Sequence, residues 1–151
     1  MNDREMMDAA LYEARIGYAE GGIPIGAVLV TPTGEIAGRG HNLRMQTGDT
    51  TAHAEIVCLR NAGRRRDWHK LTLVSTLSPC IMCSGAALLH RIPRILIGEN
   101  CTFPGAEDLL REKGAAITVL EDNRCIELMR RFIRDNPDLW DEDIGIPPSD
   151  S

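Results

Sequence analysis

The stretch LTLVSTLSPCIMC, at residues 71–83, predicts a strand that leads directly into a helix. Its first half is a nearly continuous apolar run, which is typical of a strand covered on both faces of a sheet. Ser78 is a favoured N-cap residue and Pro79 a favoured first helical residue, so we expect a helix from Pro79 onward. Cys80 and Cys83 would then share one helix face in the first turn, where the helix dipole favours thiolates.

A second segment, TAHAE at residues 51–55, contains a histidine and a carboxylate two positions apart. Two residues with this spacing point to nearly opposite sides of a regular helix. His53 and Glu55 can converge only where a helix starts, with His53 still in non-helical geometry. We expect Thr50 or Thr51 to cap that start.

The ligand types in these two segments indicate zinc. His53, Cys80 and Cys83 offer one nitrogen and two sulfur atoms. Structural zinc sites usually have four protein ligands, whereas catalytic sites have three and leave one position for water. We therefore expect one catalytic Zn²⁺ with a bound water, and a structural zinc site or a redox Cys-x-x-Cys is the alternative. A fourth ligand would have to come from residues that form no further paired spacing: Cys58, Cys101, Cys125, His41, His69 and His90.

The chain has 151 residues, of which 43% are hydrophobic and 26% charged, as in an ordinary globular domain. Its five cysteines are odd in number and lack the spacing of a disulfide framework, which favours reduced thiols. The charged N-terminus does not resemble a signal peptide, and no apolar run reaches membrane-spanning length. We expect a single domain over 1–151 and a cytoplasmic protein without a membrane segment.

The net charge of −5 argues against nucleic acid as a partner, because phosphate binding depends on clustered lysine and arginine. One local exception is the run of three arginines at 64–66, which His69 and Lys70 follow.

Apolar periodicity and turn residues predict alternating helices and strands along the chain. The expected helices are 3–20, 53–62, 79–90, 106–113 and 122–134. The expected strands are 25–31, 35–41, 71–76, 93–98 and 116–120. This alternation predicts an α/β fold, a three-layer α/β/α sandwich with a five-stranded mixed sheet. The metal would then lie at an edge of the sheet where strands end.

The C-terminal segment from Asp135 onward is acidic and contains no lysine or arginine. It also contains Leu139, Trp140, Ile144 and Ile146, which can pack back onto the domain. We predict that residues 135–146 form a lid whose polar tip includes Asp143.

His-x-Glu followed by Pro-Cys-x-x-Cys is the signature of zinc-dependent nucleobase deaminases. With this motif, the chain resembles the fungal-type cytosine deaminases of the cytidine deaminase-like superfamily. The similarity extends beyond the metal motif to residues 20–26, 38–42, 76–80, 97–100 and 140–145.

The resemblance implies that His53, Cys80 and Cys83 bind zinc and that Glu55 transfers protons. It implies hydrolytic deamination of a free nucleobase, cytosine to uracil with release of ammonia in pyrimidine salvage, by a homodimer. It also implies that Asn42 binds the pyrimidine edge and that Phe103 and Trp140 help to close the pocket. The substrate-binding residues expected on this basis are Asn42, Ala54, Ser78, Phe103, Trp140 and Asp143.

Three other functions fit part of the sequence. Residues 51–55 and the arginine run at 64–66 also resemble tRNA adenosine deaminases, for which salt-sensitive tRNA binding would be diagnostic. The protein could also deaminate another amino-heterocycle, such as guanine, isocytosine or creatinine, and a substrate panel would distinguish this function from cytosine deamination. A non-catalytic zinc-stabilised binding module would release no ammonia.

Overall fold

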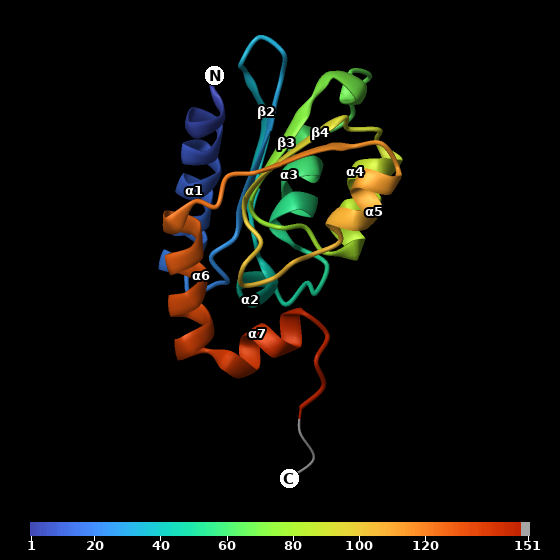
Figure 1. The fold of residues 1–151 in the computed structure, drawn as a ribbon. Helices are drawn as coiled ribbons and strands as arrows, with labels where there is room; N and C mark the ends of the chain where they lie inside the picture. The colour runs from blue at the N-terminus through green and yellow to red at the C-terminus, as the bar shows by residue number, and fades with distance from the viewer. Residues whose placement is uncertain (149–151) are drawn as a thin grey trace.

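The computed structural model describes residues 1–148, and its centre is a mixed five-stranded sheet (Figure 1). The strand order is β2-β1-β3-β4-β5, in which β1 pairs antiparallel with β2 and β3, while β3, β4 and β5 are parallel. The hairpin needs only a short turn, whereas each parallel pair needs a helical crossover. The strands are β1 Gly26–Val30, β2 Ile36–His41, β3 Thr72–Leu77, β4 Arg94–Glu99 and β5 Ala116–Val119.

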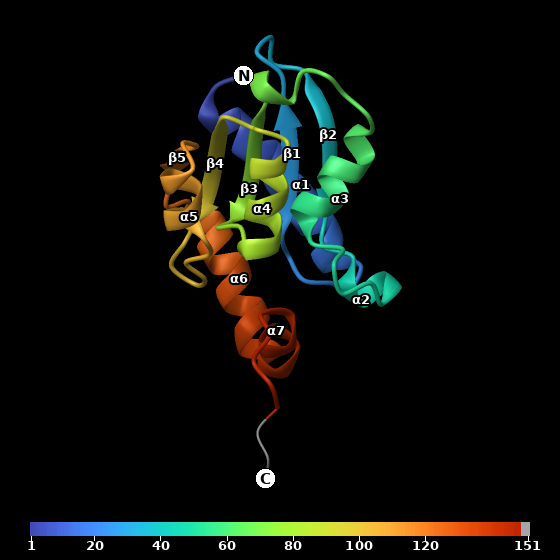
Figure 2. The ribbon, with the colours of Figure 1, turned by 90° about the vertical axis from the view of Figure 1, so that its right-hand side faces the viewer.

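Helices cover both faces of the sheet, which confirms the predicted three-layer sandwich (Figures 1 and 2). One face carries α1 and α6, and the opposite face carries α3, α4 and α5. The helices are α1 Asp3–Ala19, α2 Arg44–Thr47, α3 Ala54–Ala62, α4 Ile81–Leu89, α5 Glu107–Glu112, α6 Asn123–Asp135 and α7 Pro137–Asp143. None of the helices in the described part of the chain combines the length and apolarity needed to cross a bilayer.

The two apolar layers explain why the central strands are apolar along their whole length. Val28, Val74 and Leu96 pack against α1, while Leu29 and Leu73 belong to the core on the α3 side. All five side chains are fully buried. Residues of both strand faces are therefore withdrawn from water, as the run at 71–76 predicts.

The two expected helix caps were wrong. α4 begins at Ile81 with Cys80 as N-cap, and α3 begins at Ala54 with His53 as N-cap. The segment after β4 accounts for the first difference. Its Ala106 N–H donates to the Pro79 carbonyl (2.9 Å), and the Ser78 hydroxyl bonds to Pro104 and Glu107 instead of capping α4. In the second case, Thr51 donates its hydroxyl to Asp49 instead of capping α3.

The C-terminal segment folds back beneath the sheet edge as α7, which the sequence analysis did not predict as a helix (Figure 1). Trp140 is its anchor, with only 5% of its surface exposed. Residues 149–151, which include Asp150 of the acidic segment and the end of the predicted domain, lie outside the described residues.

Candidate metal centre and active site

Three predicted zinc ligands meet where two helices begin. His53 and Cys80 are N-cap residues with extended backbone, at φ −65°, ψ 155° and φ −68°, ψ 176° respectively. Neither side chain makes a capping hydrogen bond, so both are available to a metal. Cys83 lies in the first turn of α4, directly after the carboxyl end of β3. The extended geometry expected for His53 is confirmed, and Glu55 can share its site for that reason.

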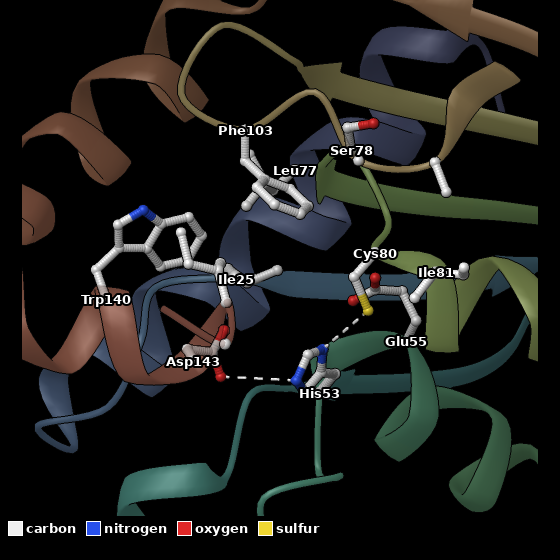
Figure 3. Close-up of a pocket in the computed structure, with 14 residues that line it drawn as sticks. Ile25, His53, Glu55, Leu77, Ser78, Cys80, Ile81, Phe103, Trp140 and Asp143 are labelled. Carbon is white, nitrogen blue, oxygen red and sulfur yellow. Dashed lines mark hydrogen bonds and ion pairs between the residues drawn. The ribbon is translucent and has the colours of Figure 1, made fainter. Parts of the chain in front are cut away.

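The separation of the ligand atoms fits a single zinc ion. The donor atoms of His53, Cys80 and Cys83 all lie within 4.8 Å of one another, and Cys80 Sγ is 3.5 Å from His53 Nδ1 (Figure 3). Tetrahedral ligands at Zn–S and Zn–N distances of about 2.3 and 2.1 Å are separated by about 4 Å. Within residues 1–148, no fourth histidine, cysteine or carboxylate joins this cluster. The three-ligand set leaves a coordination position for water, as in catalytic zinc sites.

The electrostatics of the cluster favour a thiolate at Cys80. Hydrogen bonds from Cys83 and His53 lower its pKa to about 4, against the opposing effect of burial. Burial disfavours the charged form of His53, but its hydrogen bond with Cys80 and the charge of Asp143 raise its pKa to about 9. Zinc binds the thiolate and the neutral imidazole, so metal binding releases protons from this cluster.

Glu55 places a carboxyl group beside the metal ligands. It is 4% exposed, and burial raises its pKa to about 7, opposed by the charge of His53. A carboxyl group with a pKa near neutrality can both accept and donate a proton, which general acid–base catalysis requires.

A cavity of about 520 Å³ opens onto this cluster, a size usual for small-molecule sites. Ile25, just before β1, and Leu77, the last residue of β3, line it at the sheet, and Phe103 and Trp140 line it from the loop after β4 and from α7. The two aromatic rings meet edge to face, with centroids 5.9 Å apart (Figure 3). Sequence analysis missed Ile25, whose only signal is its position between Pro24 and the start of β1.

Asn42 and Asp143 each present a buried polar atom without a hydrogen-bond partner, although Asp143 Oδ1 makes long ion pairs with His53 Nε2 (3.6 Å) and Arg44 (3.8 Å). Asn42 is fully buried, and the Asp143 side chain is 3% exposed. Among residues 1–148, neither Asn42 Nδ2 nor Asp143 Oδ1 has a hydrogen-bond partner. Burial raises the pKa of Asp143, and the charges of His53 and Arg44 oppose that rise. Buried polar atoms are rarely left unpaired, so these two atoms indicate a place for a polar ligand.

The hydroxyl of Ser78 and the side chain of Ala54 are directed into the protein. Ser78 Oγ lies 2.6 Å from Glu107 Oε2 and 2.8 Å from the Pro104 carbonyl, and in Figure 3 it points away from the cavity. Ala54 is fully buried in the core. Of the described residues that line the cavity, Ser78 is one, whereas Asn42 and Ala54 are not. Their contact with a substrate stays a prediction.

Comparison with known proteins agrees with this geometry. Residues 1–99 match the family model of the cytidine and deoxycytidylate deaminase zinc-binding region. The chain belongs to this family. It is a hydrolytic deaminase, and its His/Cys/Cys cluster fits one Zn²⁺ per chain.

Individual relatives of this deaminase differ in what their names say they act on. It is 42% identical to a cytosine deaminase of Candida albicans, over 95% of this chain and 97% of that one. It is 45% identical to a tRNA-specific adenosine deaminase of Haemophilus influenzae, over 69% of this chain and 62% of that one. A guanine deaminase structure from Nitrosomonas europaea has a TM-score of 0.71 at 23% identity, covering 84% of this chain and 82% of that one, which supports the fold.

Proposed function

We propose that this deaminase replaces the amino group of a free nucleobase, with cytosine as the first choice, by a carbonyl oxygen from water and releases ammonia. The polar side chains of Asn42 and Asp143 carry the proposal. Asp143 lines the cavity 3.6 Å from His53, and Asn42 is its buried neighbour, so the pair offers one acceptor and one donor near the metal ligands. Cytosine presents the complementary pair, a ring carbonyl oxygen and an amino group. Similarity to the Candida albicans cytosine deaminase over nearly the whole chain supports the same substrate.

When bound, zinc supplies a Lewis acid that acidifies water and positions it for attack. Glu55 accepts a proton from the attacking water and passes it to the ring nitrogen beside the attacked carbon. It then takes the second proton from the oxygen that has been added to this carbon and delivers it to the departing amino group, so that the C–N bond breaks and cytosine and water become uracil and ammonia. Its burial and its place in the first turn of α3, next to His53, suit this proton transfer.

Phe103 and Trp140 provide apolar contact for the flat faces of the base, and residues 135–146 act as the lid. We infer that α7, whose Trp140 and Asp143 line the cavity, leaves no room for a ribose attached to the base. We therefore expect cytosine to be preferred over cytidine.

The test is ammonia release from cytosine, with cytidine alongside, by the zinc-loaded protein. Glu55→Gln should keep its zinc and lose turnover, whereas Glu127→Gln, an exposed carboxylate on α6, should behave like wild type. Failure to deaminate cytosine would overturn the substrate proposal, and retained activity in Glu55→Gln would overturn the role of Glu55. A panel with guanine, isocytosine and creatinine would then identify the substrate.

Deamination of adenosine in tRNA is the second candidate, favoured by the similarity to the Haemophilus influenzae enzyme. The position of the basic run argues against it. Residues 64–66 follow the C-terminal end of α3, whereas His53 marks its N-terminal end, and nine helical residues span about 14 Å. Salt-sensitive tRNA binding with inosine formation would favour this candidate over the first.

We also propose that the deaminase forms a homodimer. α4 exposes large apolar side chains in the single chain, with Ile81 74% and Leu89 79% exposed. Contact between copies would remove this surface from water. Sedimentation should give a dimer mass for the wild type and a smaller mass for Leu89→Lys; a wild-type monomer would overturn the proposal.

A further inference from the structure

Arg44 connects the short helix α2 to the C-terminal helix that covers the pocket. Its side chain is only 12% exposed, and its guanidinium donates to the Thr50 carbonyl (3.3 Å) and the Glu142 carbonyl (3.4 Å). The same group lies 3.7 Å from the Glu142 carboxylate and 3.8 Å from Asp143 Oδ1. One side chain therefore holds two successive residues at the end of α7.

α7 has few other polar contacts on this side. It packs along the chain against α6 and inserts Trp140 into the core. In the part of the chain that the structure describes, its ion pairs and hydrogen bonds to residues before α6 join it to Arg44 and His53, and the Asn42 side chain also acts on the Asp143 carboxylate. Because His53 is a metal ligand, Arg44 is the residue whose charge is free to hold α7 in place.

Arg44 also sets the orientation of both unpartnered polar groups. Its backbone N–H donates to Asn42 Oδ1 (2.9 Å), which leaves the Asn42 amide nitrogen free for a ligand. Its guanidinium balances the charge of Asp143, a carboxylate that would be costly to bury without a nearby cation. Asp143 Oδ1 thus lies at the pocket with long ion pairs to Arg44 and to His53 (3.6 Å) and without a hydrogen-bond donor of its own.

We propose that Arg44 is a positioning residue that fastens α7 across the pocket, orients Asp143 toward the base, and so restricts the site to free bases. The substrate part of this inference rests on the proposed function, whereas the attachment of α7 does not. Arg44 does not touch the reacting atoms; it acts through Asp143 and Glu142.

The first experiment measures hydrogen exchange of the α7 amides in the zinc-loaded protein without substrate. Arg44→Met keeps the length of the aliphatic stem but removes the charge, and should lower protection throughout α7. Arg60→Met is the matched control, because Arg60 has only a distant ion pair with Asp49 (4.0 Å) and is half exposed. Unchanged protection of α7 in Arg44→Met would overturn the proposal, whether or not cytosine is the substrate.

The second experiment separates KM from kcat. Arg44→Met should raise the KM for cytosine by about tenfold or more, the equivalent of one lost charged contact, with a smaller change in kcat and unchanged zinc content. The ratio of cytidine to cytosine turnover should rise, and Arg44→Lys should restore part of the loss. Loss of zinc, a fall in kcat alone, or no rescue by lysine would overturn the positioning role. Absence of cytosine turnover in the wild type would instead refute the proposed substrate.

Discussion

Gly105 is not a metal ligand, but we expect the added methyl group of Gly105→Ala to disturb the metal centre. It adopts φ +64°, and a Cβ there would collide with the Pro79 carbonyl and with the Ser78 hydroxyl, 2.5 Å away. The left-handed conformation alone costs a residue with a side chain about 1–2 kcal/mol. The collision would also separate Ala106 N–H from the Pro79 carbonyl (2.9 Å), and an unsatisfied donor at this partly buried position costs about 1–3 kcal/mol more.

Gly48 is the matched control for this prediction. It has a similar φ of +77°, but a Cβ there would meet nothing within 4 Å. Urea denaturation should therefore show that Gly105→Ala loses about 1–3 kcal/mol more than Gly48→Ala. Because Pro79 directly precedes Cys80, Gly105→Ala should also bind zinc more weakly in a competition with a chromogenic chelator. Equal destabilisation of the two variants, with equal zinc affinity, would refute the reasoning.

Three further predictions concern stability. Asp122→Ala removes the N-cap of α6, which accepts from the Arg124 N–H, and should cost about 1 kcal/mol in urea denaturation at pH 7, with Asp122→Asn closer to wild type. The Arg124 side chain lowers the pKa of Asp122, so the ionised Asp122 carboxylate stabilises the fold above about pH 4 and loses this effect as the pH falls further. The difference in unfolding free energy between the wild type and Asp122→Ala should therefore shrink below about pH 4. Arg91→Gly should raise the free energy of unfolding by about 0.5–1 kcal/mol, because Arg91 adopts φ +58° directly after α4; a loss of stability would contradict this. Chelation of zinc should lower the melting temperature of the wild type but not of Cys80→Ser, as measured by calorimetry.

Much of the fold could be predicted from the sequence because burial follows local periodicity. The five strands and the helices α1, α3, α4, α5 and α6 all lie within a few residues of their expected positions. The helices α2 and α7 were missed because α2 has only four residues and α7, with the sequence PDLWDED, has just two adjacent apolar residues and therefore no periodic apolar face. Helix starts were displaced where another segment bonds to the expected cap, as Glu107 does to Ser78.

At the site, the motif predicted the ligand cluster. Cys80 and Cys83 are three residues apart at the start of a helix and His53 directly precedes another helix, and this local geometry is enough to let them share a metal. The sequence contains no comparable motif that would have pointed to Arg44 or Glu107.

The sequence by itself determined the layered fold and the chemistry of the metal site, since both depend on patterns that lie within one element or at its start. Only the tertiary structure decided what surrounds that chemistry. Arg44 meets Glu142 across 98 residues, and Ser78 meets Glu107 across 29. Such contacts depend on how loops pack once the sheet has formed, and no local spacing encodes them.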